Sequence, residues 1–324
     1  MFEKLVYVDG FGKGASGGYW LKAFKEHFHQ VATLNVYSRR PEIEVFNYIL
    51  KENPTYVHFG GSVKGEKFIS YKHLKELRDK IPNIHITFFY GDAYHSLYHK
   101  EVSKWVDKII MSHRPSYEVS NFEYCPCPTS LNPQKINSSK LYDVVFIGNR
   151  YIKEREDDLR RISEFCKLKV FGKGWLDSGF DCGGYVSFEE FPKVIAESKF
   201  SLGTTLYNPC EYGGWHRCVK RNASASRLCH VITCKDYREK WGYFSNRVMN
   251  LCACRACILM LYSEGLDELF TDGENIVFFK DINELQEKIE LYKDDLKKLE
   301  EIGENAYKLS QEYSFEGLVR RLLF

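Results

Sequence analysis

The segment from Asp143 to Arg150 reads DVVFIGNR and decides the fold class. Its short apolar run is followed by a glycine turn and a charged helical pattern, and a second apolar run, LKVF, begins at Leu168. Apolar strands that alternate with helical patterns are typical of βαβ units and a parallel sheet. The same alternation continues with strand-like runs at 200–203, 257–261 and 276–279. We therefore expect a doubly wound α/β domain with helices on both faces of its sheet.

The N-terminal half shows the same alternation. Strand patterns are expected at 5–8, 31–36, 56–59, 84–90 and 108–111, with helical patterns between them. Residues 124–140 hold three prolines, Pro126, Pro128 and Pro133, with several Ser and Asn residues, which is typical of a linker. We expect two Rossmann-like domains that face a cleft, an N-terminal domain at 1–135 and a C-terminal domain at 136–324 that includes the terminal helices.

Composition limits the classes of function. The 324 residues include 46 Lys and Arg against 44 Asp and Glu, and this net charge of +2 gives no global signature of a nucleic-acid binder. No apolar run approaches the roughly 18 residues that span a bilayer, so no membrane span is expected. Eleven cysteines, with no visible secretion signal, favour reduced thiols. We expect a cytoplasmic protein and make no prediction of its oligomeric state.

A glycine-rich turn follows the first predicted strand. Residues 12–17 read GKGASG and match G-x-G-x-x-G, where backbone N–H groups and a helix N-terminus can hold a phosphate. The next strand ends in Ser38, Arg39 and Arg40 instead of the acidic residue that binds an NAD ribose, and two arginines could accept a 2′-phosphate. An NADP-dependent oxidoreductase is therefore one alternative. The other is a turn in which Gly14 and Gly17 let an acceptor or phosphate approach the backbone.

The C-terminal half carries a family resemblance. SNRVMNLCAC at 245–254, GLDELF at 265–270 and DGEN at 272–275 resemble the CgeB-like spore-maturation glycosyltransferases of the broad family 1/4 group. VFIGNR at 145–150 and VFGKGW at 170–175 are similar to that family's first donor-domain loop and its later glycine-tryptophan turn. The resemblance implies a GT-B glycosyltransferase that transfers a sugar from a nucleotide-sugar donor to an unidentified acceptor, without a cofactor or a catalytic metal.

The resemblance places the donor in the C-terminal domain. A departing nucleoside diphosphate develops negative charge, which arginine, lysine and backbone amides can stabilise without a metal. The chain contains no D-x-D triplet, which weighs against a metal-dependent transferase. The family usually has a glutamate where Asn250 stands and a glycine where Arg255 stands. The predicted donor-binding residues are Gly148, Asn149, Arg150, Lys173, Ser245, Asn246, Arg247 and Asn250.

The acceptor side requires a general base if the transfer inverts the configuration at the anomeric carbon of the sugar. Asp92 is the first candidate because it directly follows the strand predicted at 84–90. Its alternative role is to cap the next helix. His58 and His95 lie at or just beyond predicted strand ends and are further catalytic candidates. His113 and Arg114 follow the strand at 108–111 and are open to the same two interpretations.

The stretch from 207 to 241 does not match the family. Basic residues outnumber acidic ones in it, and aromatic residues lie among them, so it could contact an anionic acceptor through Arg217, Lys220 and Arg221. A solvated loop that completes the donor site is the alternative, and a non-catalytic nucleic-acid or polyanion-binding protein on a degenerate GT-B scaffold is a third possible function. Its cysteines and histidines contain no C-x-x-C pair, so we assign no metal ligand.

Overall fold

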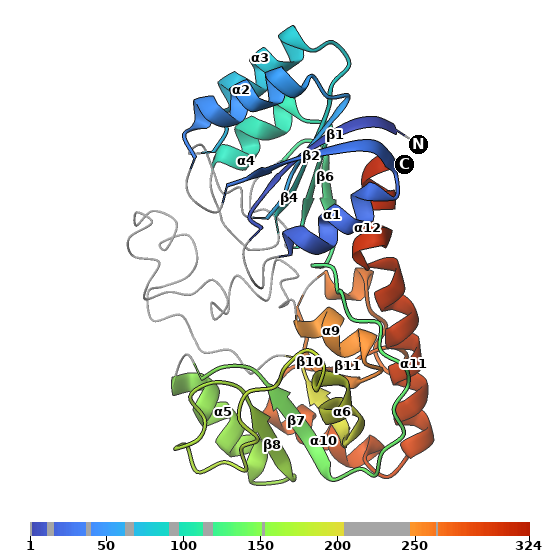
Figure 1. Cartoon of the computed structure of the whole chain (residues 1–324). Coiled ribbons are helices and arrows are strands. Elements are labelled where there is room, and N and C mark those ends of the chain that lie inside the picture. Colours follow the sequence, from blue (N-terminus) through green and yellow to red (C-terminus); the bar gives the residue numbers. More distant parts are fainter. Residues whose placement is uncertain are drawn as a thin grey trace. The chain divides into compact units, whose positions relative to one another are not determined.

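The chain folds into two compact units (Figure 1). The structure is a computed structural model and describes residues 2–11, 16–36, 40–61, 68–90, 97–112, 119–150, 153–203, 247–263 and 265–324. Unit 1 comprises Met1–Pro128 and Tyr313–Phe324, and unit 2 comprises Thr129–Glu312. Each unit contains one parallel sheet. The predicted α/β class with two Rossmann-like sheets is confirmed.

Unit 1 has a six-stranded parallel sheet in the order β2-β1-β3-β4-β5-β6. Its strands are β1 (Phe2–Asp9), β2 (Phe28–Asn35), β3 (Tyr56–Phe59), β4 (His85–Tyr90), β5 (Lys108–Met111) and β6 (Phe122–Tyr124). Its helices are α1 (Gly17–Lys25), α2 (Glu42–Glu52), α3 (Tyr71–Lys80), α4 (Leu97–Val102), η1 (Ser103–Trp105) and α12 (Phe315–Leu323). Strand β6 ends at Tyr124, the first residue of the segment that we expected to be a linker.

Alternate strand residues of unit 1 face two different helical layers. Val6 and Val8 of β1 belong to the apolar cluster that α2 and α3 complete. Tyr7, which lies between them, contacts the ring of Phe24 on the opposite helix α1. Figure 1 shows α2 and α3 on one side of the sheet and α1 and α12 on the other. Successive side chains of each strand point to opposite faces of the sheet, and helices cover both faces.

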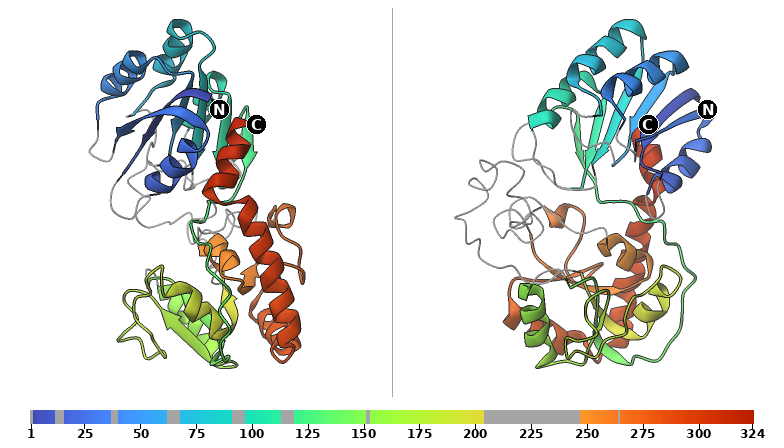
Figure 2. Two further views of the ribbon diagram at one scale, coloured as in Figure 1. Left: turned by 45° about the vertical axis from the view of Figure 1, so that its right-hand side comes forward. Right: turned by 60° about the vertical axis from the view of Figure 1, so that its left-hand side comes forward.

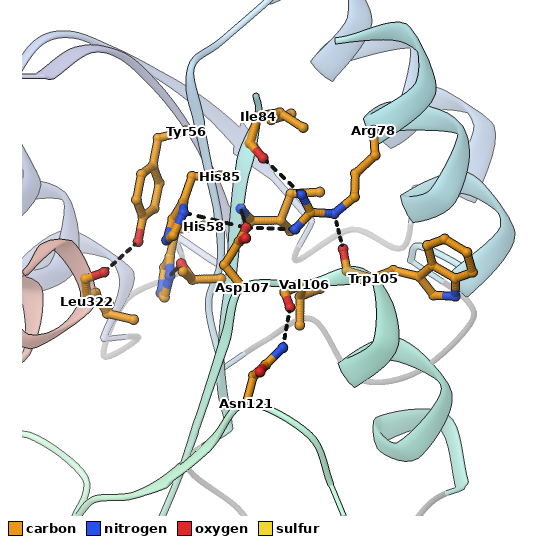
Figure 3. Close-up of polar contacts among 12 residues, drawn as sticks. Tyr56, His58, Arg78, Ile84, His85, Trp105, Val106, Asp107, Asn121 and Leu322 are labelled. Atoms are coloured by element: carbon orange, nitrogen blue, oxygen red, sulfur yellow. Dashed lines mark hydrogen bonds and ion pairs between the residues drawn. The ribbon is translucent and has the colours of Figure 1, made fainter. Parts of the chain in front are cut away.

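The C-terminal helix α12 packs on unit 1, whereas we expected the terminal helices in the C-terminal domain. The ring of Phe315 meets Trp20 of α1 edge to face at 5.3 Å. Tyr56 Oη donates to the carbonyl of Leu322 (3.2 Å; Figure 3), and Lys108 Nζ donates to the carbonyl of Arg321 (2.6 Å). These bonds satisfy carbonyls of the last helical turn, which have no partner within a helix. An amphipathic pattern shows that a helix is half-buried, but not which sheet it covers.

A polar cluster fixes α3 to the amino ends of β4 and β5 (Figure 3). Arg78 donates to the carbonyl of Trp105 (2.7 Å) and to the carboxylate of Asp107 (2.7 Å). Asp107 also accepts a hydrogen bond from the backbone N–H of Ile86 (2.7 Å). The cluster lies at the amino ends of the strands, whereas ligands of such sheets bind at the carboxyl ends. We assign it a structural role.

Unit 2 has a five-stranded parallel sheet in the order β11-β10-β9-β7-β8. Its strands are β7 (Tyr142–Ile147), β8 (Leu168–Phe171), β9 (Ser198–Leu202), β10 (Cys257–Leu261) and β11 (Val277–Phe279). Its helices are α5 (Lys153–Ser163), α6 (Phe191–Ala196), α9 (Arg247–Ala253), η4 (Leu266–Glu268), α10 (Ile282–Tyr292) and α11 (Leu296–Glu312). In the described part of the chain, no helix is long and apolar enough to cross a bilayer.

The core of unit 2 lies between the sheet and α5, α10 and α11, where Leu159, Leu285 and Ile302 pack on the strands. Figure 2 shows the long red helix α11 from two further sides. It contacts α9 and β10. The strand order reverses at β7, which pairs with β8 on one side and β9 on the other. Ligands of open α/β sheets bind at such a switch point, beyond the carboxyl ends of the strands.

Candidate active site

Two loops are joined at the carboxyl edge of the unit 2 sheet, and we call residues 148–150 and 172–175 the paired loops. The N–H of Gly148 donates to the carbonyl of Phe171 (2.8 Å), and the N–H of Arg150 donates to the carbonyl of Lys173 (3.0 Å). In the opposite direction, the N–H of Lys173 donates to Oδ1 of Asn149 (2.9 Å). The two loops therefore continue the β7–β8 pairing beyond the strands and form one backbone surface.

Glycines allow the paired loops to approach each other. Gly172 has a φ of +132°, and a Cβ atom there would overlap the carbonyl oxygen of Gly148. The same oxygen accepts a hydrogen bond from Nε1 of the fully buried Trp175 (2.6 Å). Only glycine combines this φ with so close an approach. The Gly148 turn is thus fixed through its carbonyl from the side of β8.

Two basic residues of the paired loops are exposed to solvent, Arg150 and Lys173. Arg150 forms an ion pair with Glu156 and donates to the carbonyl of Gly174 (3.4 Å). Hydrogen bonds from Arg160 and Arg150 lower the pKa of Glu156, so this carboxylate stays ionised beside the loops. Lys173 Nζ lies 5.8 Å from the ring centre of Tyr185. The edge thus presents cationic groups on a fixed backbone.

Helix α9 brings Arg247 to the same edge. Its Nη1 donates to the carbonyl of Ile147 (2.5 Å), its Nη2 donates to the carbonyl of Gly203 (3.1 Å), and its guanidinium carbon lies 4.7 Å from the ring centre of Phe146. One turn later, Oδ1 of Asn250 accepts a hydrogen bond from Thr129 Oγ1 (2.8 Å). Five of the predicted donor residues, Gly148, Asn149, Arg150, Lys173 and Arg247, therefore lie at one sheet edge.

Residues 153–323, just over half of the chain, match the family described as "Glycosyl transferase-like". The chain belongs to this family. It is a glycosyltransferase. No curated protein sequence matches it. The narrower resemblance to the CgeB-like proteins remains a prediction.

Solved structures similar to this glycosyltransferase share its fold at low sequence identity. HepE of Anabaena in complex with UDP is 11% identical with a TM-score of 0.60, and the match covers 99% of both chains. Sucrose-phosphate synthase of Thermosynechococcus elongatus is 12% identical with a TM-score of 0.59, over 99% of both chains. An α-glucosyltransferase in complex with UDP-glucose and abasic DNA is 12% identical with a TM-score of 0.57, over 100% of both chains. The predicted GT-B fold is confirmed.

Arg255 stands where the CgeB-like resemblance implies a glycine, and the structure shows how the arginine is accommodated. Arg255 has a φ of +60°, a conformation that glycine adopts without strain. Its Nε pairs with Glu304 (3.1 Å), its Nη1 donates to the carbonyl of Pro133 (3.0 Å), and its guanidinium carbon lies 3.6 Å from the ring centre of Tyr307. These contacts offset the backbone strain and hold α9 against α11.

His58, a predicted catalytic residue, lies in the core of unit 1. Its side chain is fully buried, and its Nδ1 lies 2.8 Å from Thr87 Oγ1. The rings of Trp20 (5.2 Å) and Phe24 (5.0 Å) pack on it. Burial lowers the pKa of His58 to about 3, so the imidazole is neutral. A catalytic base must reach the acceptor hydroxyl, and the structure instead gives His58 the surroundings of a packing residue.

This burial predicts a pH dependence of stability. An unfolded His58 has a pKa near 6.5, so between about pH 8 and pH 5 the unfolded chain takes up a proton that the folded chain does not. His58 should therefore lower the free energy of unfolding by about 2 kcal/mol as the pH falls over this range. Urea unfolding of the wild type and of His58→Gln at both pH values checks this. Equal pH dependence in the two proteins would contradict it.

The other predicted residues fall into two groups. Gly17 is buried at the start of α1, where an added Cβ would lie 2.7 Å from the carbonyl oxygen of Gly10. The remaining residues lie outside the described part of the chain, and their predicted roles stay predictions: Asp92, His95, His113, Arg114, Gly14, Ser245, Asn246, Arg217, Lys220 and Arg221. The cysteines and histidines at 210–234, to which we assigned no metal, lie there too. Among the residues that are described, no group of three or more His, Cys, Asp or Glu side chains could hold a metal ion.

A buried carboxylate at the carboxyl edge of unit 1 was not predicted from the sequence. Asp9, the last residue of β1, is 1% exposed. Its Oδ1 accepts a hydrogen bond from the N–H of Gly10 (2.7 Å), and its Oδ2 accepts one from Tyr7 Oη. A Cβ on Gly60 would overlap its carboxylate, so Asp9 fills the space beside the end of β3. The signal was present in the sequence, because an acidic residue directly ends an apolar strand and precedes a glycine.

Proposed function

We propose that this glycosyltransferase uses a UDP-sugar as its donor and binds the donor's diphosphate at the paired loops of unit 2. The observation that carries the proposal is the pair of exposed basic residues, Arg150 and Lys173, on two hydrogen-bonded loops at the carboxyl edge of an open α/β sheet. Such edges are the usual ligand sites of this fold. The similar structures of HepE and of the α-glucosyltransferase contain UDP or UDP-glucose, which favours uracil as the base of the donor.

The chemistry of sugar transfer fits these groups. The acceptor hydroxyl oxygen forms a bond to the anomeric carbon and gives up its proton. The bond from that carbon to the diphosphate oxygen breaks, and the departing UDP gains negative charge. Cations already fixed near that oxygen stabilise this charge without reorganising during the reaction. Lys173 supplies a compact ammonium group, and Arg150 supplies a planar guanidinium that Glu156 orients. We propose that these side chains take the place of a divalent metal ion, as the absent D-x-D triplet suggests.

A thermal-shift panel in EDTA tests the donor and the metal together. The panel compares UDP, UDP-glucose, GDP-, TDP- and ADP-sugars with NADP. A ligand that binds only the folded protein stabilises it by about 2.7 kcal/mol at a concentration of about 100 times its Kd. We expect UDP and a UDP-sugar to raise the melting temperature in EDTA. Stabilisation by NADP alone would support the oxidoreductase instead, and a shift that requires added manganese would contradict the metal-free mechanism.

The same panel on the variant Lys173→Ala tests whether the diphosphate lies at the paired loops. The Lys173 side chain is exposed, and its Nζ lies 5.8 Å from the ring centre of Tyr185. Its removal should leave the melting temperature of the free protein unchanged, because exposed side chains contribute little to stability. It should reduce the shift that UDP produces. An undiminished shift would place the diphosphate elsewhere.

A further inference from the structure

We propose that Arg247 is a positioning residue, which acts on the donor through the Gly148 turn and does not itself contact the phosphates. This proposal rests on the proposed function, because it presumes that UDP binds at the paired loops. We predicted Arg247 to be a donor contact, since an arginine at a helix start is suited to a phosphate. The contacts of its guanidinium indicate a different role.

The guanidinium of Arg247 is engaged by the protein on several sides. Nη1 and Nη2 donate to the carbonyls of Ile147 and Gly203, which stand at the carboxyl ends of the neighbouring strands β7 and β9. The face of the same group lies over the ring of Phe146. The planar fork of an arginine can bridge two acceptors and stack on an aromatic ring at once, which a lysine cannot do. Arg247 therefore clamps the two strand ends.

The clamp also forms the surface on which Gly148 rests. A Cβ on Gly148 would overlap Nη1 of Arg247 and would lie 2.9 Å from Cζ of Phe146. On its other side, the Gly148 carbonyl accepts the hydrogen bond from Trp175 Nε1. The turn is thus held between α9 and β8, and loss of either support should loosen it. Because Gly148 leads into Asn149 and Arg150, a loose turn displaces the groups proposed to bind the diphosphate.

Charge gives the clamp a second effect. The carbonyl oxygens at the carboxyl ends of β7 and β9 carry partial negative charges, which would oppose an anionic ligand at this edge. Arg247 binds both oxygens and neutralises them. The residue can therefore favour diphosphate binding without touching it. Removal of the Arg247 side chain would leave two carbonyl groups without these hydrogen bonds, which costs free energy in a partly buried site.

Two measurements on five variants test the proposal. The variants are Arg247→Ala, Arg247→Lys, Gly148→Ala, the double variant Arg247→Ala with Gly148→Ala, and the control Lys173→Ala. The first measurement is amide hydrogen exchange of the segment 147–150 without nucleotide, with exchange of residues 2–9 in unit 1 as the control for folding. The second is the Kd of UDP in EDTA, measured by calorimetry under conditions where each variant is folded.

We expect faster exchange at 147–150 in Arg247→Ala and in Arg247→Lys, with no change at 2–9. UDP affinity should fall about tenfold or more in both, because lysine keeps the charge but loses the bridge. The double variant should bind UDP no worse than the weaker single variant, since both changes act through one turn. Lys173→Ala should weaken binding and leave exchange at 147–150 unchanged.

A direct phosphate contact predicts the opposite pattern. Arg247→Lys would then recover most of the affinity, exchange at 147–150 would stay at the wild-type rate in Arg247→Ala, and the losses from Arg247→Ala and Gly148→Ala would add. Any of these results would overturn the positioning role. If the wild type does not bind UDP, the proposed donor is wrong. The exchange measurement uses no nucleotide and still decides whether Arg247 holds the Gly148 turn.

Discussion

Alanine in place of Gly172 is expected to weaken UDP binding about tenfold or more and to lower the free energy of unfolding by about 2 to 4 kcal/mol. The backbone of Gly172 has a φ of +132°, and an added Cβ would overlap the carbonyl oxygen of Gly148. The paired loops must move apart to admit the methyl group. Both the β7–β8 extension and the cation-bearing surface would be lost. Calorimetry with UDP and urea unfolding measure the two effects.

Gly179→Ala is the matched control for Gly172→Ala. Gly179 also has a positive φ, +79°, but a Cβ there would meet no atom within 4 Å. Gly179→Ala should lower the free energy of unfolding by about 1 kcal/mol, through backbone strain alone, and leave UDP affinity unchanged. The difference between the two variants isolates the overlap with Gly148. If Gly172→Ala bound UDP as well as Gly179→Ala does, the paired loops would not form the donor site.

Gly303→Ala should destabilise unit 2 by about 2 to 4 kcal/mol, although alanine favours a helix interior by about 1 kcal/mol over glycine. Gly303 lies in α11, and its Cβ would overlap the backbone carbonyl of Arg255, which follows α9. The methyl group would push the two helices apart and break the pair between Arg255 and Glu304. Urea unfolding of the variant measures this cost.

Gly18→Ala separates helix propensity from packing. Gly18 is an exposed residue of α1, and a Cβ there would meet nothing within 4 Å. We expect this variant to be as stable as the wild type or more stable by up to about 1 kcal/mol. Equal effects of Gly18→Ala and Gly303→Ala would show that the contact between α11 and the end of α9 is not tight.

The strands of unit 2 could be predicted because each is a short apolar run that is bounded by polar or glycine residues. The predicted runs at 168–171 and 257–261 coincide with β8 and β10. Strand β6 could not be found in the same way, because Phe122–Tyr124 is only three residues long and borders a proline-rich segment. The place of α12 depends on contacts such as Tyr56 with Leu322, which are far apart in the sequence.

The candidate site was predictable where it depends on local sequence. The glycine turns at 148 and 172 could be found from short motifs that follow apolar strands. The roles of single side chains could not, since they depend on register and long-range contacts. His58 is buried because it pairs in register with Tyr7 and Thr87 on both neighbouring strands. Arg247 was predicted as a donor contact, but two of its partners are the carbonyls of Ile147 at the end of β7 and of Gly203 after β9.

The location of the nucleotide is the central claim, and amide hydrogen exchange of the wild-type protein with and without UDP in EDTA tests it most directly. Bound ligand slows exchange where it orders the backbone or shields it from water. We predict slower exchange in the segments 147–150 and 171–175 of unit 2, and no change at residues 2–9 of unit 1. Protection confined to the glycine-rich segment 10–17 of unit 1, with none at the paired loops, would contradict the account.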